Sequence, residues 1–241
     1  MASRTVLTLG GTGAIGRAAV ARLRADGLDV VVARRGPATG DDEIGGVDLS
    51  DRAGVERCLA GLAARGVSPD VVVALAAAPT RGALGELTDA ELAAGAFVKV
   101  WAPGLLAEAL CPAMADRGFG RVVVATGITG REPVDGYLAG AAVNAAARAL
   151  VKGLAPRWAD RGVTVNAVSP GPVAGDRFAA VQQRTAATAR NPFMRGPAGM
   201  PAGRYLDADE LAAAIAFLCG DGAGGVNGTE LLVDGAASLG L

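Results

Sequence analysis

Three glycines spaced three residues apart lie near the start of the chain, in the segment LGGTGAIG from Leu9 to Gly16. Such glycines let a chain turn tightly, let backbone N–H groups approach a pyrophosphate and let a helix pack closely on a strand. The segment follows an apolar run and opens an amphipathic one, and this context makes the pattern informative. The alternative is a plain turn in a chain with 36 glycines. We predict a dinucleotide-binding loop that contains Gly10, Thr12, Gly13, Ala14, Ile15 and Gly16.

A pair of arginines, Arg34 and Arg35, ends the next apolar run, VVVARR. An Asp or Glu at this point would bind a ribose 2′-hydroxyl, whereas a guanidinium can pair with a 2′-phosphate through charge-assisted, bidentate hydrogen bonds. The pair therefore favours NADP(H) over NAD(H) as the cofactor. Solvated arginines are also common after strands, so a surface role is the alternative.

Residue types that are missing exclude other chemistry. The chain has no histidine, which excludes a Ser-His-Asp triad, a Cys-His pair and a His-ligated zinc. Cys58, Cys111 and Cys219 form no CxxC motif and lie among alanines and leucines, so we expect them to be buried small hydrophobes, and we expect no metal. The 23 basic and 24 acidic side chains are spread along the sequence, which argues against a nucleic-acid partner.

Short β-branched runs alternate with longer amphipathic stretches. This alternation predicts an α/β fold with a doubly wound, Rossmann-like parallel sheet, in a single domain over residues 1–241. The predicted strands are Val6–Leu9, Val30–Ala33, Gly46–Leu49, Asp70–Leu75, Arg121–Ala125, Val163–Val168 and Glu230–Val233. The predicted helices are Ile15–Asp26, Arg52–Arg65, Glu86–Asp116 with a break near Pro103, Tyr137–Arg161 and Asp207–Leu218. The polar stretch from Pro170 to Tyr205 receives no element.

The sequence shows no targeting or membrane segment. MASRTVLTLG at the start carries no signal-peptide pattern. No apolar run approaches the roughly 20 residues that a membrane helix needs. We therefore expect a soluble, cytoplasmic protein with a small-molecule substrate and no membrane partner.

With these segments in place, the chain from Val6 to Gly235 resembles the short-chain dehydrogenase/reductase family. VDLSD, from Val47 to Asp51, is similar to the family's motif after the third strand, and VTVNAVSPGPV, from Val163 to Val173, is similar to its sixth strand and Pro-Gly turn. The C-terminal stretch from Asp207 to Ala236 is similar to its last helix and strand. The resemblance implies that the cofactor is also contacted by Asp48, Leu49, Ala76, Pro170, Gly171 and Val173.

The catalytic positions depart from the family, whose members use an Asn, a Ser, a Tyr and a Lys. The YxxxK motif appears as Tyr137 followed by Ala141 in place of the lysine. The strand that should end in Ser-Ser reads VVVATG, which puts Gly127 at the catalytic serine, and Lys99 stands at the asparagine. The resemblance is therefore to a divergent member with a degenerate active site.

These losses differ in their consequences. An unassisted tyrosine stays protonated at neutral pH, so Tyr137 can donate a proton for carbonyl reduction but is a poor base for oxidation. The lost serine removes a polarising donor, a deficit of about 2.7–4 kcal/mol if it acts like an oxyanion-hole group. Thr129, or Thr126 if displaced, could supply a hydroxyl instead.

Lys99 offers one compensation for the lost lysine. We hypothesise that its long stem carries the ammonium group toward the vacated site at Ala141, because only one other lysine occurs in the chain. The alternative is that Lys99 points to solvent or to an interface. We name Tyr137 and Lys99 as the candidate catalytic residues.

The resulting hypothesis is an atypical NADP(H)-dependent oxidoreductase that reduces a carbonyl or enone of a small organic substrate, with Tyr137 as proton donor. The alternatives are a non-redox enzyme on the same fold, such as a cyclase, isomerase or dehydratase, and a non-catalytic partner of an active relative. By resemblance, the segment from Ala174 to Gly203 covers the substrate pocket, and the subunits form a homotetramer or homodimer. Trp101 and Trp158 are interpreted as interface or core residues.

Overall fold

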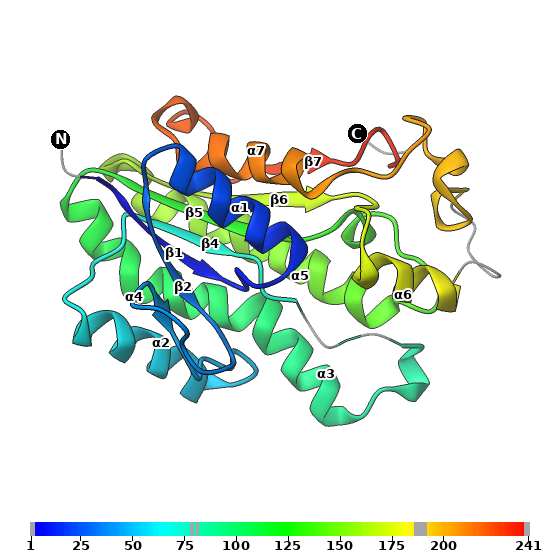
Figure 1. Cartoon of the computed structure of the whole chain (residues 1–241), viewed down its shortest axis with the longest axis horizontal. Coiled ribbons are helices and arrows are strands. Elements are labelled where there is room, and N and C mark those ends of the chain that lie inside the picture. Colours follow the sequence, from blue (N-terminus) through cyan, green and yellow to red (C-terminus); the bar gives the residue numbers. More distant parts are fainter. Residues whose placement is uncertain (1–2, 78–79, 81, 186–191, 239–241) are drawn as a thin grey trace.

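Seven parallel strands form one sheet in the order β3-β2-β1-β4-β5-β6-β7 (Figure 1). They are β1 (Thr5–Leu9), β2 (Asp29–Ala33), β3 (Glu43–Ile44), β4 (Val71–Ala74), β5 (Gly120–Ala125), β6 (Val163–Pro170) and β7 (Glu230–Val233). The computed structural model describes residues 3–77, 80, 82–185 and 192–238. The doubly wound α/β fold class predicted from the sequence is confirmed.

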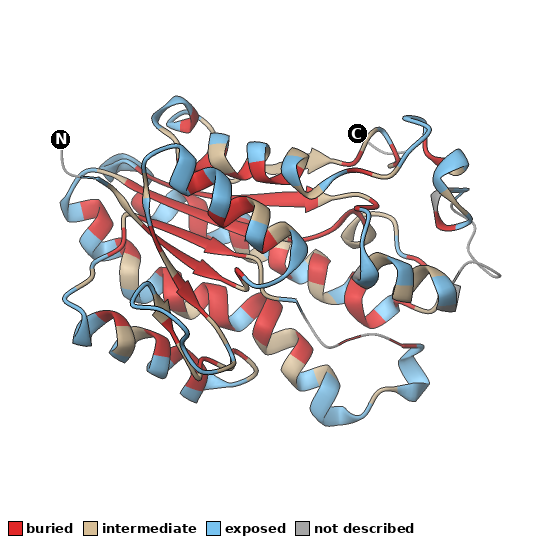
Figure 2. Ribbon diagram, in the orientation of Figure 1, coloured by how far each residue is buried: buried red, intermediate tan, exposed pale blue. Residues whose placement is uncertain are grey.

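Helices cover both faces of the sheet (Figure 1). One face is covered by α1 (Ala14–Ala25) and α7 (Ala208–Cys219), and the other by α2 (Arg52–Ala64), α4 (Ala102–Asp116) and α5 (Leu138–Leu154). Successive strand side chains point to opposite faces. Val71 and Val73 therefore pack beneath α1 and α7, whereas Val72 packs on the α2 side. Figure 2 shows the central strands as the buried middle layer, which is why their sequences are apolar throughout.

The long helical region differs from the prediction in where it changes geometry. Helix α3 (Asp89–Ala96) passes into a π-helical turn at Phe97–Trp101, which leads directly into α4. Pro103 lies in the first turn of α4 and has no N–H to donate to the carbonyl four residues earlier. The chain accordingly widens just before the proline instead of breaking at it.

The same region also exceeds what the sequence led us to expect about apolar length. The combined stretch Asp89–Asp116 is long and apolar enough to cross a membrane by length and composition. Yet 56% of its most apolar window is buried within the protein, as in the core helix of a soluble domain.

Two further expectations are wrong. The third strand is Glu43–Ile44 and not Gly46–Leu49, because Gly46 turns the chain out of the ladder with a φ of +71°. The stretch after β6 contains a helix, α6 (Asp176–Thr185), which the sequence analysis missed because most of its residues are polar. The apolar side chains of α6 include Phe178 and Val181, which pack on a small cluster with Met194 and Met200.

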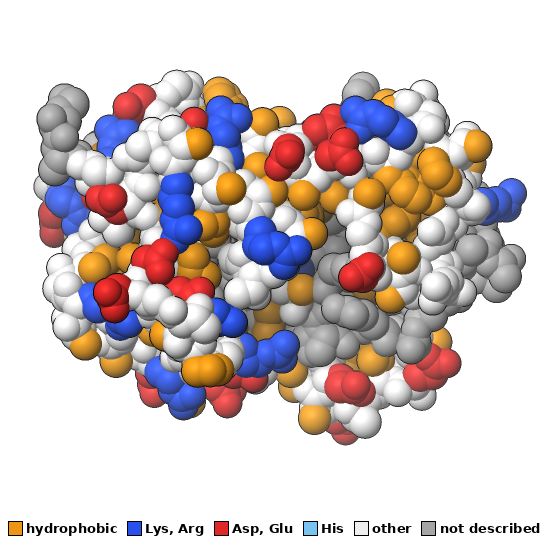
Figure 3. Space-filling view, in the orientation of Figure 1, with side chains coloured by type: hydrophobic (Ala, Val, Ile, Leu, Met, Phe, Trp, Pro, Cys, Tyr) orange, Lys and Arg blue, Asp and Glu red, His pale blue; other side chains and the backbone are white. Residues whose placement is uncertain are grey.

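The remaining landmarks agree with the sequence analysis. Strand β7 has the predicted bounds, and α5 continues as a 3₁₀ helix over Ala155–Arg161. The three cysteines are free and buried, and burial raises the pKa of each thiol to about 12. Trp158 is in the core, whereas Trp101 is 55% exposed. Basic and acidic side chains are interspersed on the face seen in Figure 3.

Candidate functional site

A central cavity of about 510 Å³ opens at the carboxyl ends of β1, β4, β5 and β6. The strand order reverses between β1 and β4, and doubly wound folds bind ligands outside the carboxyl ends of the strands at this point. Most residues predicted for the site line this cavity: Gly10, Gly13, Ala14, Ile15, Gly16, Lys99, Tyr137, Pro170, Gly171 and Val173.

The three loop glycines have separate structural reasons. Gly10 has a φ of +79°, and a Cβ on it would lie 2.7 Å from the Ala76 backbone. A Cβ on Gly16 would lie 2.2 Å from the Gly10 carbonyl oxygen, so this glycine allows α1 to pack on the end of β1. Gly13 has no such neighbour: its closest contact would be 3.9 Å away.

Gly13 instead borders open space at the start of α1. It is the N-cap of the helix, and its residue type provides no side-chain cap for the first N–H groups. Unpaired N–H groups at a helix N-terminus attract anions, and a glycine lets a phosphate approach the backbone. The loop therefore fits a dinucleotide pyrophosphate.

An outer cavity of about 550 Å³ lies beside the loop and is lined by residues that include Thr12, Arg17, Thr39 and Glu43. The Arg17 guanidinium donates to the Thr12 carbonyl oxygen at 2.5 Å, which braces the loop. This cavity lies between the loop and the connection from β2 to β3, but neither arginine predicted to bind the 2′-phosphate belongs to its lining.

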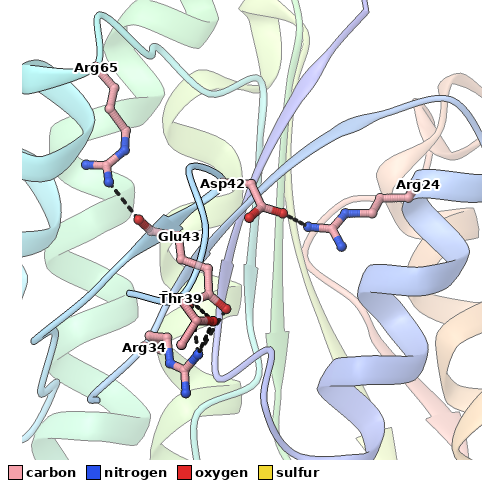
Figure 4. A network of polar contacts seen from close by, with 6 residues as sticks. All are labelled: Arg24, Arg34, Thr39, Asp42, Glu43 and Arg65. Carbon is pink, nitrogen blue, oxygen red and sulfur yellow. Dashed lines mark hydrogen bonds and ion pairs between the residues drawn. The ribbon is translucent and has the colours of Figure 1, made fainter. Parts of the chain in front are cut away.

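Arg34 is paired with an acidic residue that the sequence analysis overlooked (Figure 4). Its Nη1 donates to both carboxylate oxygens of Glu43, at 2.9 and 3.1 Å, and to the Thr39 hydroxyl at 3.0 Å. The Thr39 backbone N–H, followed by the Arg34 guanidinium, lowers the pKa of Glu43 to about 2. Glu43 is therefore ionised at neutral pH and neutralises Arg34.

Five predicted cofactor contacts lie outside the linings of both cavities, and Arg34 is one of them. Arg35 is exposed. The Asp48 carboxylate accepts the Ser50 N–H at 3.0 Å, and its neighbour Leu49 is buried in the main core. Ala76 lies two residues after the end of β4 and adjoins Gly10.

The Pro-Gly turn forms the opposite wall of the central cavity. Pro170 is the last residue of β6, and a Cβ on Gly171 would lie 2.7 Å from the Asp234 Cα. Val173 pairs with Leu206 in an isolated bridge, which ties the turn to the segment before α7. The turn is thus held against the residue that follows β7 and the segment that precedes α7.

Tyr137 lines the central cavity immediately before α5 and is 9% exposed. Its ring lies over Gly140, where a Cβ would come within 2.1 Å of Cζ. Ala141, at the position of the missing lysine, is the next residue of α5 and is buried.

Lys99 lies in the π-helical turn and is 7% exposed, so the solvent-facing alternative does not describe its position. Its Nζ donates to the Ala125 carbonyl oxygen, at the end of β5, at 2.7 Å. Single π turns inside helices frequently occur at functional sites. Here the turn places an ammonium group in the lining of the cavity that also contains Tyr137.

The end of β5 carries two threonines with different surroundings. The Thr126 hydroxyl donates to Glu230 at 3.0 Å, and the Glu230 carboxylate is buried and also paired with Arg131 at 2.6 Å. The Thr129 hydroxyl accepts a hydrogen bond from the Asn144 side-chain amide at 3.0 Å. Asn144 was not singled out by the sequence analysis, although a buried amide within the apolar run of α5 is a signal that could have found it.

Comparison with known proteins assigns the fold to a family. The family model described as enoyl-(acyl carrier protein) reductase matches residues 11–238. The chain belongs to the short-chain dehydrogenase/reductase family. A solved structure from Thermus thermophilus is 30% identical, with a TM-score of 0.84 over 98% of this chain and 99% of that one. The NADPH-dependent reductase YwfH, involved in bacilysin biosynthesis, shares the fold, with a TM-score of 0.87 at 20% identity over 100% of both chains.

Two curated relatives of this chain are reductases by name. The acetoacetyl-CoA reductase of Allochromatium vinosum is 36% identical over 122 residues, which are 51% of this chain and 47% of that protein. The 3-oxoacyl-(acyl-carrier-protein) reductase of Salmonella typhimurium is 28% identical over 243 residues, covering 96% of each. This chain's match therefore spans about half the length of the acetoacetyl-CoA reductase and nearly all of the second relative.

Proposed function

We propose that this protein is an NADP(H)-dependent reductase of a carbonyl or enone group on a small organic substrate, with Tyr137 as the proton donor. The supporting observation is that Tyr137 and Lys99 line the same cavity as the glycine loop and the Pro-Gly turn. The lining also includes Ile128, Val134, Phe178, Val181 and Met194. Apolar walls of this kind suit a largely apolar substrate.

The cofactor would be held by backbone groups at both walls of the cavity. The loop from Gly10 to Gly16 would hold the pyrophosphate at the start of α1, and Pro170 and Gly171 would lie beside the nicotinamide. When bound, the nicotinamide supplies the hydride.

Tyr137 then donates the proton, and Lys99 stabilises the negative charge that this leaves. The Tyr137 hydroxyl donates its proton to the substrate oxygen and becomes a phenolate. A proton from solvent then restores the hydroxyl. The Lys99 ammonium is fixed by the Ala125 carbonyl and lies in the same lining, so it favours negative charge in the cavity. Lys99 thereby provides the positive charge that Ala141 lacks.

Replacing Lys99 tests this assignment. We expect Lys99→Met to lower the turnover of NADPH with a panel of ketones and enones by about 10²-fold, the lower range for an electrostatic group in an active site. The matched control is Lys152→Met, because Lys152 is the other lysine and is exposed on α5. Unchanged turnover and cofactor affinity in Lys99→Met would contradict the proposal. Product formation without NADPH oxidation would instead favour a non-redox enzyme.

The preference for NADP(H) rests on Arg34 and Arg35. Arg35 is exposed beside the paired Arg34, and the Glu43 carboxylate holds Arg34 away from a second anion. We expect calorimetry to show tighter binding of NADPH than of NADH. Reversing both arginine charges should remove the difference.

Removing the carboxylate at residue 43 separates the two arginines. We expect Glu43→Gln to strengthen NADPH binding by roughly 10- to 100-fold, because a charge-assisted pair contributes roughly 1.5–3 kcal/mol once Arg34 is released. NADH binding should stay the same. Glu56→Gln, an exposed glutamate on α2, is the control. Equal changes for both cofactors would show that Glu43 acts only on local structure.

We also propose a cytoplasmic protein that forms a homotetramer or homodimer, the oligomeric state that the family resemblance implies. Trp101 is 55% exposed and Leu138 43% exposed on adjoining elements, and such apolar side chains suit a subunit interface. Light scattering of the purified chain measures its mass against 23.8 kDa for one subunit.

A further inference from the structure

We infer that Thr129, positioned by Asn144, donates a hydrogen bond to the substrate oxygen. Thr129 would thereby replace the serine that this chain lacks, because residue 127 is a glycine. The inference rests on the proposed function, because it names the group that polarises the carbonyl for Tyr137. Thr129, Asn144 and Tyr137 line the same central cavity.

The hydrogen bond between the two side chains leaves the threonine proton available. A hydroxyl has one proton to donate and two lone pairs that accept. Asn144 Nδ2 donates to Thr129 Oγ1 at 3.0 Å, and within the described part of the chain this is the bond that the hydroxyl makes. The Thr129 proton can therefore point into the cavity toward a carbonyl oxygen.

Asn144 is placed to hold this hydroxyl and little else. It is 4% exposed on α5, and its Oδ1 has no hydrogen-bond partner among the described residues. An unpaired buried amide oxygen costs about 1–3 kcal/mol, so packing alone does not favour an asparagine at this position. Thr129 lies in the 3₁₀ turn Ile128–Gly130, which packs against α5 at Gly130.

The Asn144 side chain leaves no room for a side chain at residue 127. A Cβ on Gly127 would lie 2.9 Å from Asn144 Nδ2 and 3.7 Å from Thr129 Oγ1. A serine at residue 127 would therefore project into the space that the amide occupies. The glycine at residue 127 and the asparagine at residue 144 are therefore linked differences from the family pattern. Together they place the hydroxyl at residue 129 instead of residue 127.

The neighbouring hydroxyl cannot take this role. Thr126 Oγ1 is bonded to the buried Glu230 carboxylate at 3.0 Å and lies 3.3 Å from the Val168 carbonyl oxygen. An ionised carboxylate only accepts, so the Thr126 proton is used there. In the proposed reduction Thr129 keeps its own proton throughout, because the proton that reaches the substrate oxygen comes from Tyr137.

Substitutions at residue 129 test the donor. We expect Thr129→Val to lower kcat for carbonyl reduction by about 10²–10³-fold, as for the loss of one oxyanion-hole donor, with unchanged NADPH affinity by calorimetry. Thr129→Ser keeps the hydroxyl and should retain most of the activity. The matched control is Thr164→Val in β6, a buried threonine outside the cavity lining.

A stability cycle between residues 127 and 144 tests the steric part without any turnover. We expect Gly127→Ser alone to lower the thermal midpoint, because Asn144 occupies the space that the serine needs. In an Asn144→Ala background, the same substitution should not lower the midpoint further. We also expect Asn144→Ala alone to lower kcat more than it changes KM, and the double variant to recover turnover through the new serine. That recovery distinguishes a positioning role from a purely structural one.

The outcomes separate this inference from the proposed function. Wild-type protein that binds NADPH but reduces none of the carbonyl substrates overturns both. Wild-type turnover together with full kcat in Thr129→Val overturns only the role of Thr129. Additive midpoints in the stability cycle overturn the linkage between Gly127 and Asn144.

Discussion

At the scale of single residues, the small side chain of Gly140 decides where the Tyr137 ring lies. The ring atoms Cζ, Cε1 and Cε2 would lie 2.1, 2.4 and 2.6 Å from a Cβ on Gly140. The ring therefore rests on the first turn of α5, in a space that any other residue would fill. Tyr137, the proposed proton donor, and Gly140 therefore pack as one unit.

Adding one methyl group tests this unit. We expect Gly140→Ala to displace the Tyr137 ring and lower turnover by about 10²-fold, since a misplacement of roughly 1 Å in a catalytic group can have that effect. Gly153→Ala on the same helix has nothing within 4 Å of the new Cβ and should keep full turnover. Wild-type activity in Gly140→Ala, measured with the same carbonyl panel, would show that the ring position does not matter for the reaction.

At the scale of elements, the β1–α1 junction contains one glycine that packing requires and one that we propose binds the cofactor. Gly16 lets α1 approach the backbone of Gly10, whereas Gly13 leaves open space at the helix N-terminus. Both belong to one sequence pattern. Gly16 is needed for the helix to pack on the strand, whereas Gly13 leaves the N–H groups at the helix N-terminus accessible.

Alanine at each position should therefore have opposite effects. We expect Gly16→Ala to lower the free energy of unfolding by about 1–3 kcal/mol through overpacking. Gly13→Ala should leave stability unchanged or slightly higher, because Gly13 has a φ of −74° that alanine adopts readily. It should instead weaken NADPH binding by about tenfold or more as the pyrophosphate loses its approach. Denaturant titration and calorimetry measure the two effects, and a loss of stability in Gly13→Ala would contradict this division.

At the scale of the whole molecule, the titration behaviour follows from the absence of histidine and from paired carboxylates. The pKa values of Glu43 and Glu210 are lowered to about 2, the first mainly by the Thr39 backbone N–H and the second mainly by Arg204. The pKa of Asp221 is also lowered, by its hydrogen bond from Arg4. Burial raises the pKa of the three cysteines.

These shifts predict a flat stability profile around neutral pH. Because the folded-state carboxylate pKa values lie below the unfolded ones, their stabilisation is complete above pH 4.5 and is lost as the pH falls toward 2. The cysteine pKa values are raised, so their stabilisation is complete below pH 9 and is lost above it. We expect constant thermal midpoints from about pH 5.5 to about pH 7.5. A sloping midpoint within that range would indicate a titrating group that these shifts do not include.

The order of elements and the glycine loop could be derived from the sequence because both depend on local patterns. Apolar runs of strand length located β4 to β7 within a few residues, and the loop glycines stand next to one another in the chain. Local patterns failed where a contact set the structure: β3 begins earlier than expected, and α6 is stabilised by Phe178 and Val181 on a distant cluster.

Only the tertiary structure decided which polar groups meet in the site. Glu43 reaches Arg34 through the pairing of β2 with β3, and Lys99 reaches the Ala125 carbonyl of β5 from the π-helical turn. Asn144 lies against Gly127, seventeen residues earlier in the chain. The sequence by itself determined which residue types were available and the fold that carries them. Their partners depend on how helices pack on the sheet, because a side chain's neighbours in space are set by that packing and not by spacing along the chain.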